Sequence, residues 1–355
     1  VPEAARQRLL QYRPAAEPRR DPLEKAAAGE VATRRAQVLF QFLRDAPRLV
    51  NAQGLAAATS AVTPWPHQAH TASRVAATYP KRYMLCDEVG LGKTIEAGLV
   101  LRQLVLSGLC RRALILAPKS VCRQWQEELY EKFALNVPVF DGRAFRDAFG
   151  QEWPAATENP CDGADLYIAS SQLAKRAERQ PQLLAARPWD LVVVDEAHHA
   201  RRKDFLADQY RPNRLLELLL GREGQPGLKD RTQGLLLMTA TPMQVHPVEV
   251  WDLLQALGLG GRWGASHKDF LRFFQELRRP FGKVDWPFVL EMLEEYLGPG
   301  GEVDPAFAAE ARAALGTVEW YDLRSLVTSH EREARLRQLS PRARLLLVEM
   351  ARRHT

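Results

Sequence analysis

Short apolar runs alternate with helical patterns between residues 82 and 241. Each run is apolar at nearly every position, as in strands that are buried on both faces of a parallel sheet. The runs are Tyr83–Cys86, Ala113–Leu116, Val137–Phe140, Leu166–Ala169, Leu191–Val194 and Leu235–Met238. Strands that alternate with helices in this way predict an α/β fold with a doubly wound parallel sheet.

A helical segment is predicted ahead of this region. Val38, Leu39 and Phe42 recur at spacings that place them on one helical face. Pro64 and Pro66 then break the pattern, because proline lacks a backbone N–H and disfavours helix in the residue before it. We therefore expect a new domain to begin close to these prolines.

Beyond Pro242 the alternation stops and helical spacing returns. Phe270, Phe273 and Leu277 fall at i, i+3 and i+7, which predicts an amphipathic helix, and Pro341–Arg353 predicts another. The chain thus divides into three predicted parts: a helical N-terminal extension at 1–60, a sheet domain at 61–244 and a helical C-terminal protrusion at 245–355.

Composition narrows the class of protein without identifying a partner. The 355 residues are 46% hydrophobic and 26% charged, which is ordinary for a globular protein. The 49 Lys and Arg residues exceed the 43 Asp and Glu residues, and the net charge of +6 favours a polyanionic partner. That surplus of positive charge is too small to show by itself that the partner is a polyanion.

Cysteine spacing and hydropathy favour an intracellular protein. The four cysteines lack the C-x-x-C spacing of a metal-binding pair, so we expect reduced thiols in the core. They are Cys86, Cys110, Cys122 and Cys161. No apolar stretch reaches the roughly 18 residues that cross a bilayer, so we expect a cytoplasmic protein without a membrane partner. Because Val1 stands in place of Met, we also expect a piece of a longer protein.

A glycine-rich turn follows the first apolar run and precedes a helical stretch, which is the context of a phosphate-binding loop. In such a loop Lys93 reaches the β- and γ-phosphates of a nucleotide and Thr94 ligates Mg²⁺. The tail G-x-G-K-T is intact, although Asp87 stands where the general pattern G-x-x-x-x-G-K-[ST] has glycine. The residues expected to bind the nucleotide are Asp87, Gly90, Leu91, Gly92, Lys93 and Thr94.

Two adjacent acids end the apolar run at 191–194. The C-terminal edge of a parallel sheet is where such folds bind ligands, so Asp195 can hold Mg²⁺ while Glu196 orients and deprotonates the attacking water. We expect Lys93, Asp195 and Glu196 to form the catalytic set. A zinc site at His198 is not expected, because no second cluster with metal-ligand spacing accompanies it.

The motif Thr239-Ala240-Thr241-Pro242 ends the last apolar run. Its hydroxyl groups should therefore lie at the same sheet edge as His198, where hydrogen bonds can relay between a nucleotide site and a nucleic-acid site. We assign Thr239, Thr241 and His198 this coupling role. An ordinary turn after a strand is the alternative.

Four segments together resemble the superfamily-two helicases and, within them, the Swi/Snf-type ATPases. They are DEVGLGKTIEAG at 87–98, LILAPKSVCRQW at 114–125, VVVDEAHH at 192–199 and LLLMTATPMQ at 235–244. Asp87 matches this family, and Thr239-Ala240-Thr241 differs from the Ser-Ala-Thr motif of most RNA helicases. The resemblance, from about Pro64 to Gln255, implies a RecA-like ATPase lobe at 61–244 that uses ATP and Mg²⁺.

The resemblance also assigns contacts to single residues. Gln68 is similar to the family's adenine-reading glutamine, although a polar residue at a helix start is the alternative. The positions where the first lobe touches DNA phosphates are Lys119, Ser120, Ser170 and Ser171. Such residues also act as caps or turns. The basic run at 201–203 is either a DNA contact or a solvated face.

The resemblance implies a bacterial-type DNA translocase with two lobes, of which this chain contains the first and the start of the linker. No Q-x-x-G-R-x-x-R sequence occurs, so the second lobe's arginines are missing. Loss of arginine fingers lowers turnover about 10³- to 10⁵-fold, so we expect this chain alone to hydrolyse ATP poorly. The implied partners are double-stranded DNA, the second lobe of the full-length protein, and transcription or phage-defence proteins. An RNA helicase and a nucleotide-gated scaffold remain alternatives.

Overall fold

The computed structural model describes residues 54–88, 90–156, 158–203, 210–222, 224–297 and 303–353. The helix predicted around Phe42 lies outside the described residues. The chain forms two compact units, Val1–Leu257 and Gly258–Thr355. The unit boundary therefore falls 13 residues after the end of the predicted sheet domain at 244.

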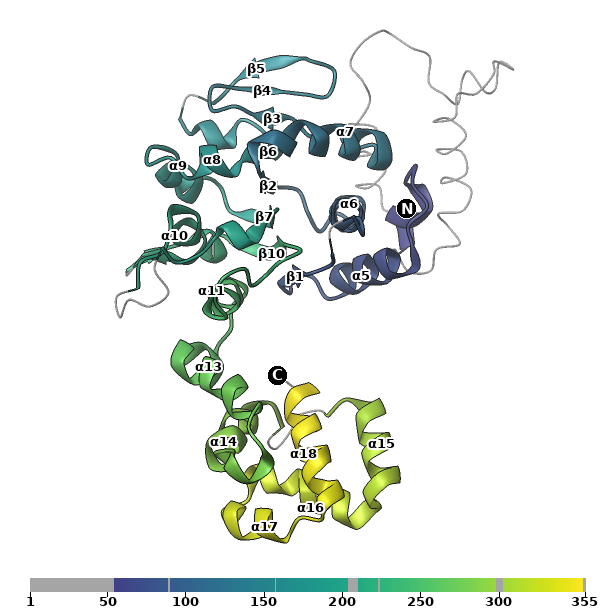
Figure 1. The fold of residues 1–355 in the computed structure, drawn as a ribbon. Helices are drawn as coiled ribbons and strands as arrows, with labels where there is room; N and C mark the ends of the chain where they lie inside the picture. Colours follow the sequence, from purple (N-terminus) through teal and green to yellow (C-terminus); the bar gives the residue numbers. More distant parts are fainter. Residues whose placement is uncertain are drawn as a thin grey trace, which may run out of the picture. The chain divides into compact units, whose positions relative to one another are not determined.

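An eight-stranded sheet forms the centre of the first unit, with strand order β1-β10-β7-β2-β6-β3-β4-β5 (Figure 1). The strands are β1 (Tyr83–Leu85), β2 (Ala113–Ala117), β3 (Val139–Phe140), β4 (Ala144–Arg146), β5 (Glu152–Pro154), β6 (Leu166–Ser170), β7 (Trp189–Val194) and β10 (Thr232–Met238). All neighbours pair in parallel except β3 with β4 and β4 with β5. Every predicted apolar run contributes a strand to this sheet, which confirms the α/β class, although Cys86, Val137 and Pro138 lie outside the strands.

Side chains alternate between the two faces of the sheet, and each face is covered by helices. Ile115 and Val193 belong to one core cluster, whereas Leu114 and Val192 belong to the other. The helices over the first face are α4 (Leu55–Thr59), α5 (Pro66–Ala77), α6 (Lys93–Leu106) and α7 (Cys122–Phe133). Those over the second are α8 (Ser171–Ala174), α9 (Arg179–Ala185), α10 (Arg214–Leu220) and α11 (Val248–Leu257). The strands are therefore buried on both sides, as their continuous apolar character predicts.

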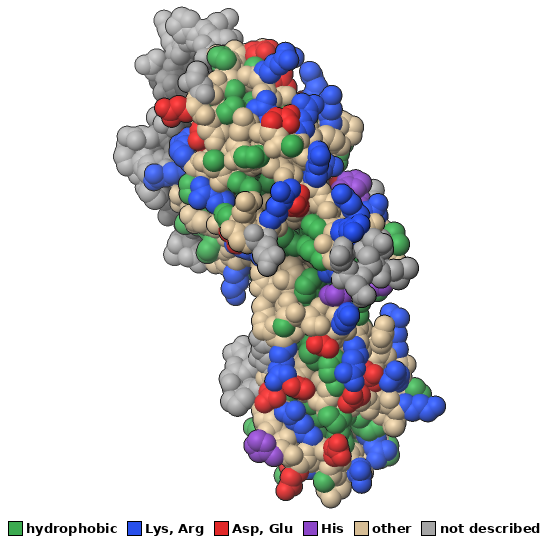
Figure 2. Space-filling view, turned by 90° about the vertical axis from the view of Figure 1, so that its left-hand side faces the viewer, with side chains coloured by type: hydrophobic (Ala, Val, Ile, Leu, Met, Phe, Trp, Pro, Cys, Tyr) green, Lys and Arg blue, Asp and Glu red, His purple; other side chains and the backbone are tan. Residues whose placement is uncertain are grey.

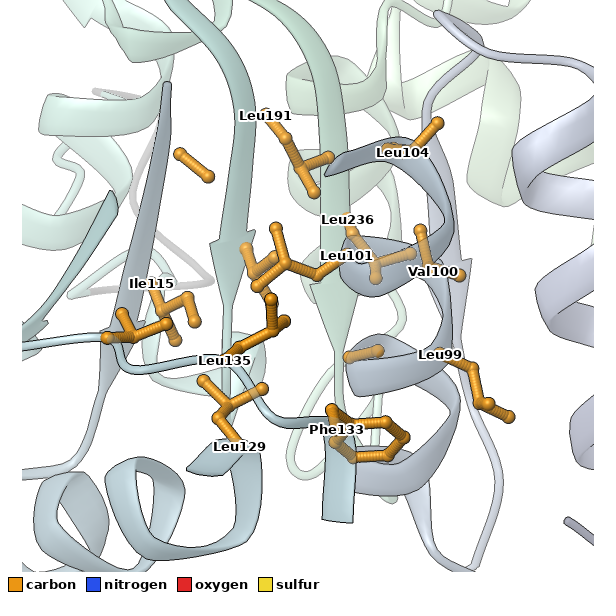
Figure 3. Packing of buried hydrophobic residues seen from close by; sticks show 14 of the residues in the cluster. Leu99, Val100, Leu101, Leu104, Ile115, Leu129, Phe133, Leu135, Leu191 and Leu236 are labelled. Atoms are coloured by element: carbon orange, nitrogen blue, oxygen red, sulfur yellow. The ribbon is translucent and has the colours of Figure 1, made fainter. Parts of the chain in front are cut away.

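Helix α6, which begins at the phosphate loop, is anchored in the first core (Figure 3). Leu101 and Leu104 are almost completely buried against the sheet, and burial of each such side chain contributes about 1.5–3 kcal/mol. Gly98 allows close packing against α7, because a Cβ atom there would lie 2.2 Å from the ring of Phe133. The start of the helix is therefore held in a fixed place relative to the strand ends.

The second unit is helical in its described part. Its α-helices are α12 (Gly261–Ala265), α13 (His267–Glu276), α14 (Trp286–Leu297), α15 (Pro305–Leu315), α16 (Thr317–Ser325), α17 (Arg332–Gln338) and α18 (Pro341–Arg353). The amphipathic helix predicted around Phe270 is α13, in which Phe270 and Phe273 are buried against Trp263. The helix predicted at 341–353 is α18.

The surface and the cysteines refine two expectations from composition. Figure 2 shows Lys and Arg side chains interspersed with Asp and Glu on the face in view, so charge there has no single sign. The cysteines are free as predicted, but Cys86 is exposed and not a core thiol, because it follows the end of β1. No helix among the described residues is long and apolar enough to cross a membrane.

Candidate nucleotide site

The phosphate loop has the backbone shape that its glycines allow. Gly90 and Gly92 adopt φ angles of 89° and 85°, a region that side chains with a Cβ rarely enter. Gly92 is the N-cap residue of α6, so Lys93 and Thr94 form the first turn of a 14-residue helix. The N–H groups and the dipole of that turn create a site that attracts anions.

Lys93 lies over the loop that precedes it. Its Nζ donates hydrogen bonds to the carbonyl oxygens of Asp87, at 2.6 Å, and Glu88, at 3.1 Å. The ammonium group is thus on the inner side of the turn that the glycines form. A phosphate bound in the loop would compete with these two carbonyls for its protons.

Gln68, a residue of α5, connects this helix to the phosphate loop by a hydrogen bond. Its Nε2 donates to the Leu91 carbonyl at 2.8 Å, and its Oε1 accepts from the Trp65 N–H at 2.9 Å. Only 5% of Gln68 is exposed, and a Cβ at Gly92 would lie 2.4 Å from its Nε2. Gln68 therefore supports both the helix start and the loop in this structure, and its role as an adenine reader stays a prediction.

Asp195 is held at the tip of β7. Its Oδ2 accepts from the indole Nε1 of Trp125 at 2.9 Å, and its Oδ1 accepts from the Glu196 N–H at 2.9 Å. Burial raises the pKa of Asp195, whereas the Trp125 hydrogen bond and the positive charge of Lys93 lower it. Asp195 thus lies at the C-terminal end of β7, at the same edge of the sheet as the loop that follows the parallel strand β1.

Glu196 is presented by an unusual backbone conformation. Its φ angle of 50° lies in the left-handed region, which costs a non-glycine residue about 1 kcal/mol or more and is frequent at functional sites. Its Oε2 lies 3.2 Å from Nδ1 of His198, and that Nδ1 lies 3.0 Å from Oγ1 of Thr239. Burial lowers the pKa of His198, which favours the neutral imidazole.

The tips of β7 and β10 are therefore joined by side chains. Thr239 is fully buried and its Oγ1 also accepts from the Thr241 N–H at 3.1 Å. The hydrogen-bonded series runs from His198 through Thr239 to Thr241, and Glu196 lies beside its His198 end. Whether it couples two ligand sites stays a prediction.

These groups fit a magnesium nucleotide. The loop offers N–H donors, a lysine and a helix N-terminus for phosphates, and Thr94 and Asp195 offer oxygens for a hard cation. The carboxylate of Glu196 lies beside them and is only partly buried, so water can reach it. The phosphates of ATP would be held by the loop and the start of α6, and Thr94 and Asp195 would hold Mg²⁺.

Glu96 is a buried acid beside the phosphate loop that was not predicted from the sequence. It lies on the first turn of α6 and is fully buried. Its pKa is raised to about 8, first by burial and then by the neighbouring Asp87 carboxyl group. At neutral pH Glu96 is therefore mostly protonated, so two carboxyl groups can lie together below the loop without mutual repulsion.

The residues predicted to touch DNA lie on two neighbouring strand ends. Lys119 and Ser120 follow β2 and are exposed, whereas Ser171 is buried and Ser170 caps α8 by accepting from the Leu173 N–H. A further residue, missed from the sequence, joins the two ends. The Oε1 atom of Gln172 accepts from the Lys119 N–H at 3.0 Å and lies 3.3 Å from Ser171 Oγ.

The basic run at 201–203 is not a uniform charged surface. Arg202 is only 7% exposed and pairs with Asp252 of α11 at 2.9 Å, so it is not available to DNA phosphates. A lone Arg-Arg-Lys run gives no sign of such a partner 50 residues away. Trp125 was missed for a similar reason, since the sequence shows only that it follows β2.

The family follows from a comparison with known domains. The family model of the SNF2-related domain matches residues 67–294. The chain belongs to the SNF2-related domain family. The match confirms the Swi/Snf-type resemblance and continues beyond Gln255, where that resemblance ends.

Among curated proteins, relatives from Vibrio species are similar to the chain. The RNA polymerase-associated protein RapA of Vibrio campbellii is 38% identical over 180 residues, and that of Vibrio vulnificus is 37% identical. Each alignment covers 51% of this chain and 17% of the relative. The chain thus aligns with a small part of the length of these relatives.

Two solved structures from Sulfolobus solfataricus are also similar. The SWI2/SNF2 ATPase core in complex with dsDNA has a TM-score of 0.47 and 16% identity, covering 81% of this chain and 58% of that one. The SWI2/SNF2 ATPase core domain has a TM-score of 0.43 and 17% identity, covering 83% and 64%.

Proposed function

We propose that this chain is the ATP-binding lobe of a motor that hydrolyses ATP and, in the complete protein, moves along double-stranded DNA. The observation that carries the proposal is the placement of the Lys93 loop and Asp195 after parallel strands, β1 and β7, at the same edge of the sheet in an SNF2-related domain. A nucleotide with its cation needs both a phosphate cradle and an adjacent acid. Here the fold supplies the two from strands that are far apart in sequence.

Each side chain has a defined task in this proposal. Lys93 leaves the carbonyls of Asp87 and Glu88 to neutralise the β- and γ-phosphates. Thr94 and Asp195 hold Mg²⁺, which neutralises charge on the phosphates when bound. Glu196 orients the attacking water and accepts its proton, and Trp125 keeps the Asp195 carboxylate turned toward the site.

The nucleic-acid partner is proposed to be double-stranded DNA. The sequence has Thr239-Ala240-Thr241 in place of the motif of most RNA helicases, and the net charge of +6 favours a polyanionic partner. The name of the RapA relatives favours a transcription partner, so we propose RNA polymerase as a protein partner of the complete protein. The second RecA-like lobe is proposed to follow in the same protein.

Phosphate release by the full-length protein tests this function. We expect ATP hydrolysis to rise when duplex DNA is added and to respond less to duplex or single-stranded RNA. Glu196→Gln keeps the size of the side chain but removes the base, so hydrolysis should fall at least about 100-fold while ATP still binds. Glu127→Gln, an exposed residue of α7, is the matched control.

Three outcomes would oppose the proposal. An ATPase rate that does not change when DNA is added would rule out the proposed DNA translocase. Stronger stimulation by RNA than by DNA would favour the alternative function, an RNA helicase. A Glu196→Gln protein with full biological activity would favour the nucleotide-gated scaffold, because a scaffold needs no water-activating base.

A further inference from the structure

Two chain segments meet beyond the catalytic acids, one after β7 and one after β10. Arg201 and Arg202 belong to the first segment, while Glu249 and Asp252 lie on α11 in the second. We call these four side chains the clamp. They are within the same compact unit as the nucleotide site, so their contacts belong to one body.

The inner half of the clamp is a buried ion pair. Arg202 Nε lies 2.9 Å from Asp252 Oδ2 and its second nitrogen, Nη2, lies 3.0 Å from Oδ1, in a two-pronged geometry. Asp252 is completely buried, and the guanidinium lies 5.5 Å from the ring centre of Trp251. Separating the segments would leave a charge buried without its partner, so this pair holds α11 to the segment that follows β7.

The outer half of the clamp shapes the segment after Thr241. Glu249 is 2% exposed, and its Oε2 accepts the N–H groups of Gln244 at 2.7 Å, Val245 at 2.9 Å and His246 at 3.4 Å. Its Oε1 lies 3.7 Å from Arg201. One carboxylate thus gathers three successive backbone donors and is itself faced by an arginine from the other segment.

The clamped segment connects back to the catalytic base. Gln244 Nε2 donates to Thr241 Oγ1 at 3.2 Å, and the Thr241 N–H donates to Thr239 Oγ1 at 3.1 Å. Thr239 then contacts His198, which lies beside Glu196. The clamp and this series close a ring between the tips of β7 and β10, so neither segment can shift without disturbing the other.

We propose that the clamp is a set of positioning residues that makes the segment 241–246 respond to the nucleotide. This segment carries two exposed apolar side chains, Met243 at 52% and Val245 at 67%. A change at Glu196 on nucleotide binding reaches them through the ring. The inference rests on the proposed function, because it takes the Lys93 and Asp195 site to bind ATP.

Hydrogen exchange of the 355-residue chain tests the clamp without requiring DNA. A slowly hydrolysed ATP analogue with Mg²⁺ should increase protection of the Gln244, Val245 and His246 amides. In Glu249→Ala this response should be lost while the analogue still binds, because the hydrogen bonds that shape the phosphate loop come from Gln68 and Lys93. Glu249→Gln keeps an acceptor oxygen and the same size, and it should recover part of the response.

A matched control separates coupling from loss of stability. Asp162→Asn weakens the buried Arg112–Asp162 pair, whose oxygen and nitrogen lie 2.5 Å apart near the opposite ends of the strands. This variant should keep the response of the Gln244 amide. An unresponsive wild-type segment, or a response that is equal in Glu249→Ala, would overturn the clamp.

The ATPase rate of the full-length protein distinguishes this inference from the proposed function. With wild-type protein stimulated by duplex DNA, Glu249→Ala should lower the ratio of stimulated to basal kcat by about 2- to 30-fold and leave the KM for ATP nearly unchanged. If DNA does not stimulate the ATPase rate of the wild-type protein but the nucleotide still protects the Gln244 amide, the proposed translocase function is wrong and the proposal for the clamp stands. An unchanged kcat ratio in Glu249→Ala would reject the clamp and retain the translocase.

Discussion

Asp195 reaches the end of β7 with both carboxylate oxygens engaged by hydrogen bonds. One donor is a backbone N–H that any sequence would supply, and the other is the indole of Trp125. The indole belongs to α7, which follows β2 in the sequence, whereas the phosphate loop precedes β2. A residue outside the acid motif thus fixes the orientation of the acid.

Replacing Trp125 by Phe tests this support. The ring is kept but the donor to Asp195 is lost, so we expect the Mg²⁺ concentration for half-maximal ATP hydrolysis to rise about tenfold. Titration of the full-length protein with Mg²⁺ at saturating ATP measures it. Trp153→Phe, which removes an indole bond to the Gly163 carbonyl, is the control. Equal Mg²⁺ requirements in the two variants would contradict the role of Trp125.

At the scale of elements, the phosphate loop depends on how α6 packs. The helix carries the loop at its N-terminus, and its glycine at 98 lets the Phe133 ring of α7 approach closely. Few side chains of α6 beyond its first turn touch solvent. The position of Lys93 is therefore set by hydrophobic packing that extends well beyond the loop.

Gly98→Ala should weaken that packing. Alanine favours a helix by about 1 kcal/mol over glycine, but its Cβ would lie 2.2 Å from the Phe133 ring. We expect a net loss of about 1–3 kcal/mol in the free energy of unfolding, measured by urea denaturation. Phe133→Leu should lower the free energy of unfolding less in the Gly98→Ala background than in the wild type. Gly282→Ala, where nothing lies near the added carbon, should change stability by less than about 0.5 kcal/mol.

The sequence predicts the strands, the loop and the acids because each depends on local chemistry. Buried parallel strands must be apolar, and the glycines at 90 and 92 are required by their φ angles. The antiparallel strands β4 and β5 were not predicted, since Ala144–Arg146 and Glu152–Pro154 are short and mixed in polarity. Long-range partners such as Asp252 for Arg202 were also missed, because a pairing between distant residues leaves no local pattern.

At the scale of the whole molecule, the chain presents one nucleotide-binding lobe and a separate helical unit. The arginine-bearing sequence of a second lobe does not occur in its 355 residues. We expect this chain to bind ATP but to hydrolyse it about 10³-fold or more slower than the full-length protein with DNA. Single-turnover phosphate release from both proteins measures the difference, and similar rates would show that the described site needs no second lobe.

The central claim is that the Lys93 turn and the Asp195 strand tip hold one magnesium nucleotide. A crystal structure of the chain with Mg²⁺ and a slowly hydrolysed ATP analogue tests it most directly. We predict that Lys93 Nζ leaves the Asp87 carbonyl for the β- and γ-phosphates and that Mg²⁺ lies between Thr94 and Asp195. A triphosphate bound elsewhere, with the Lys93 and Asp87 contact intact, would contradict the account.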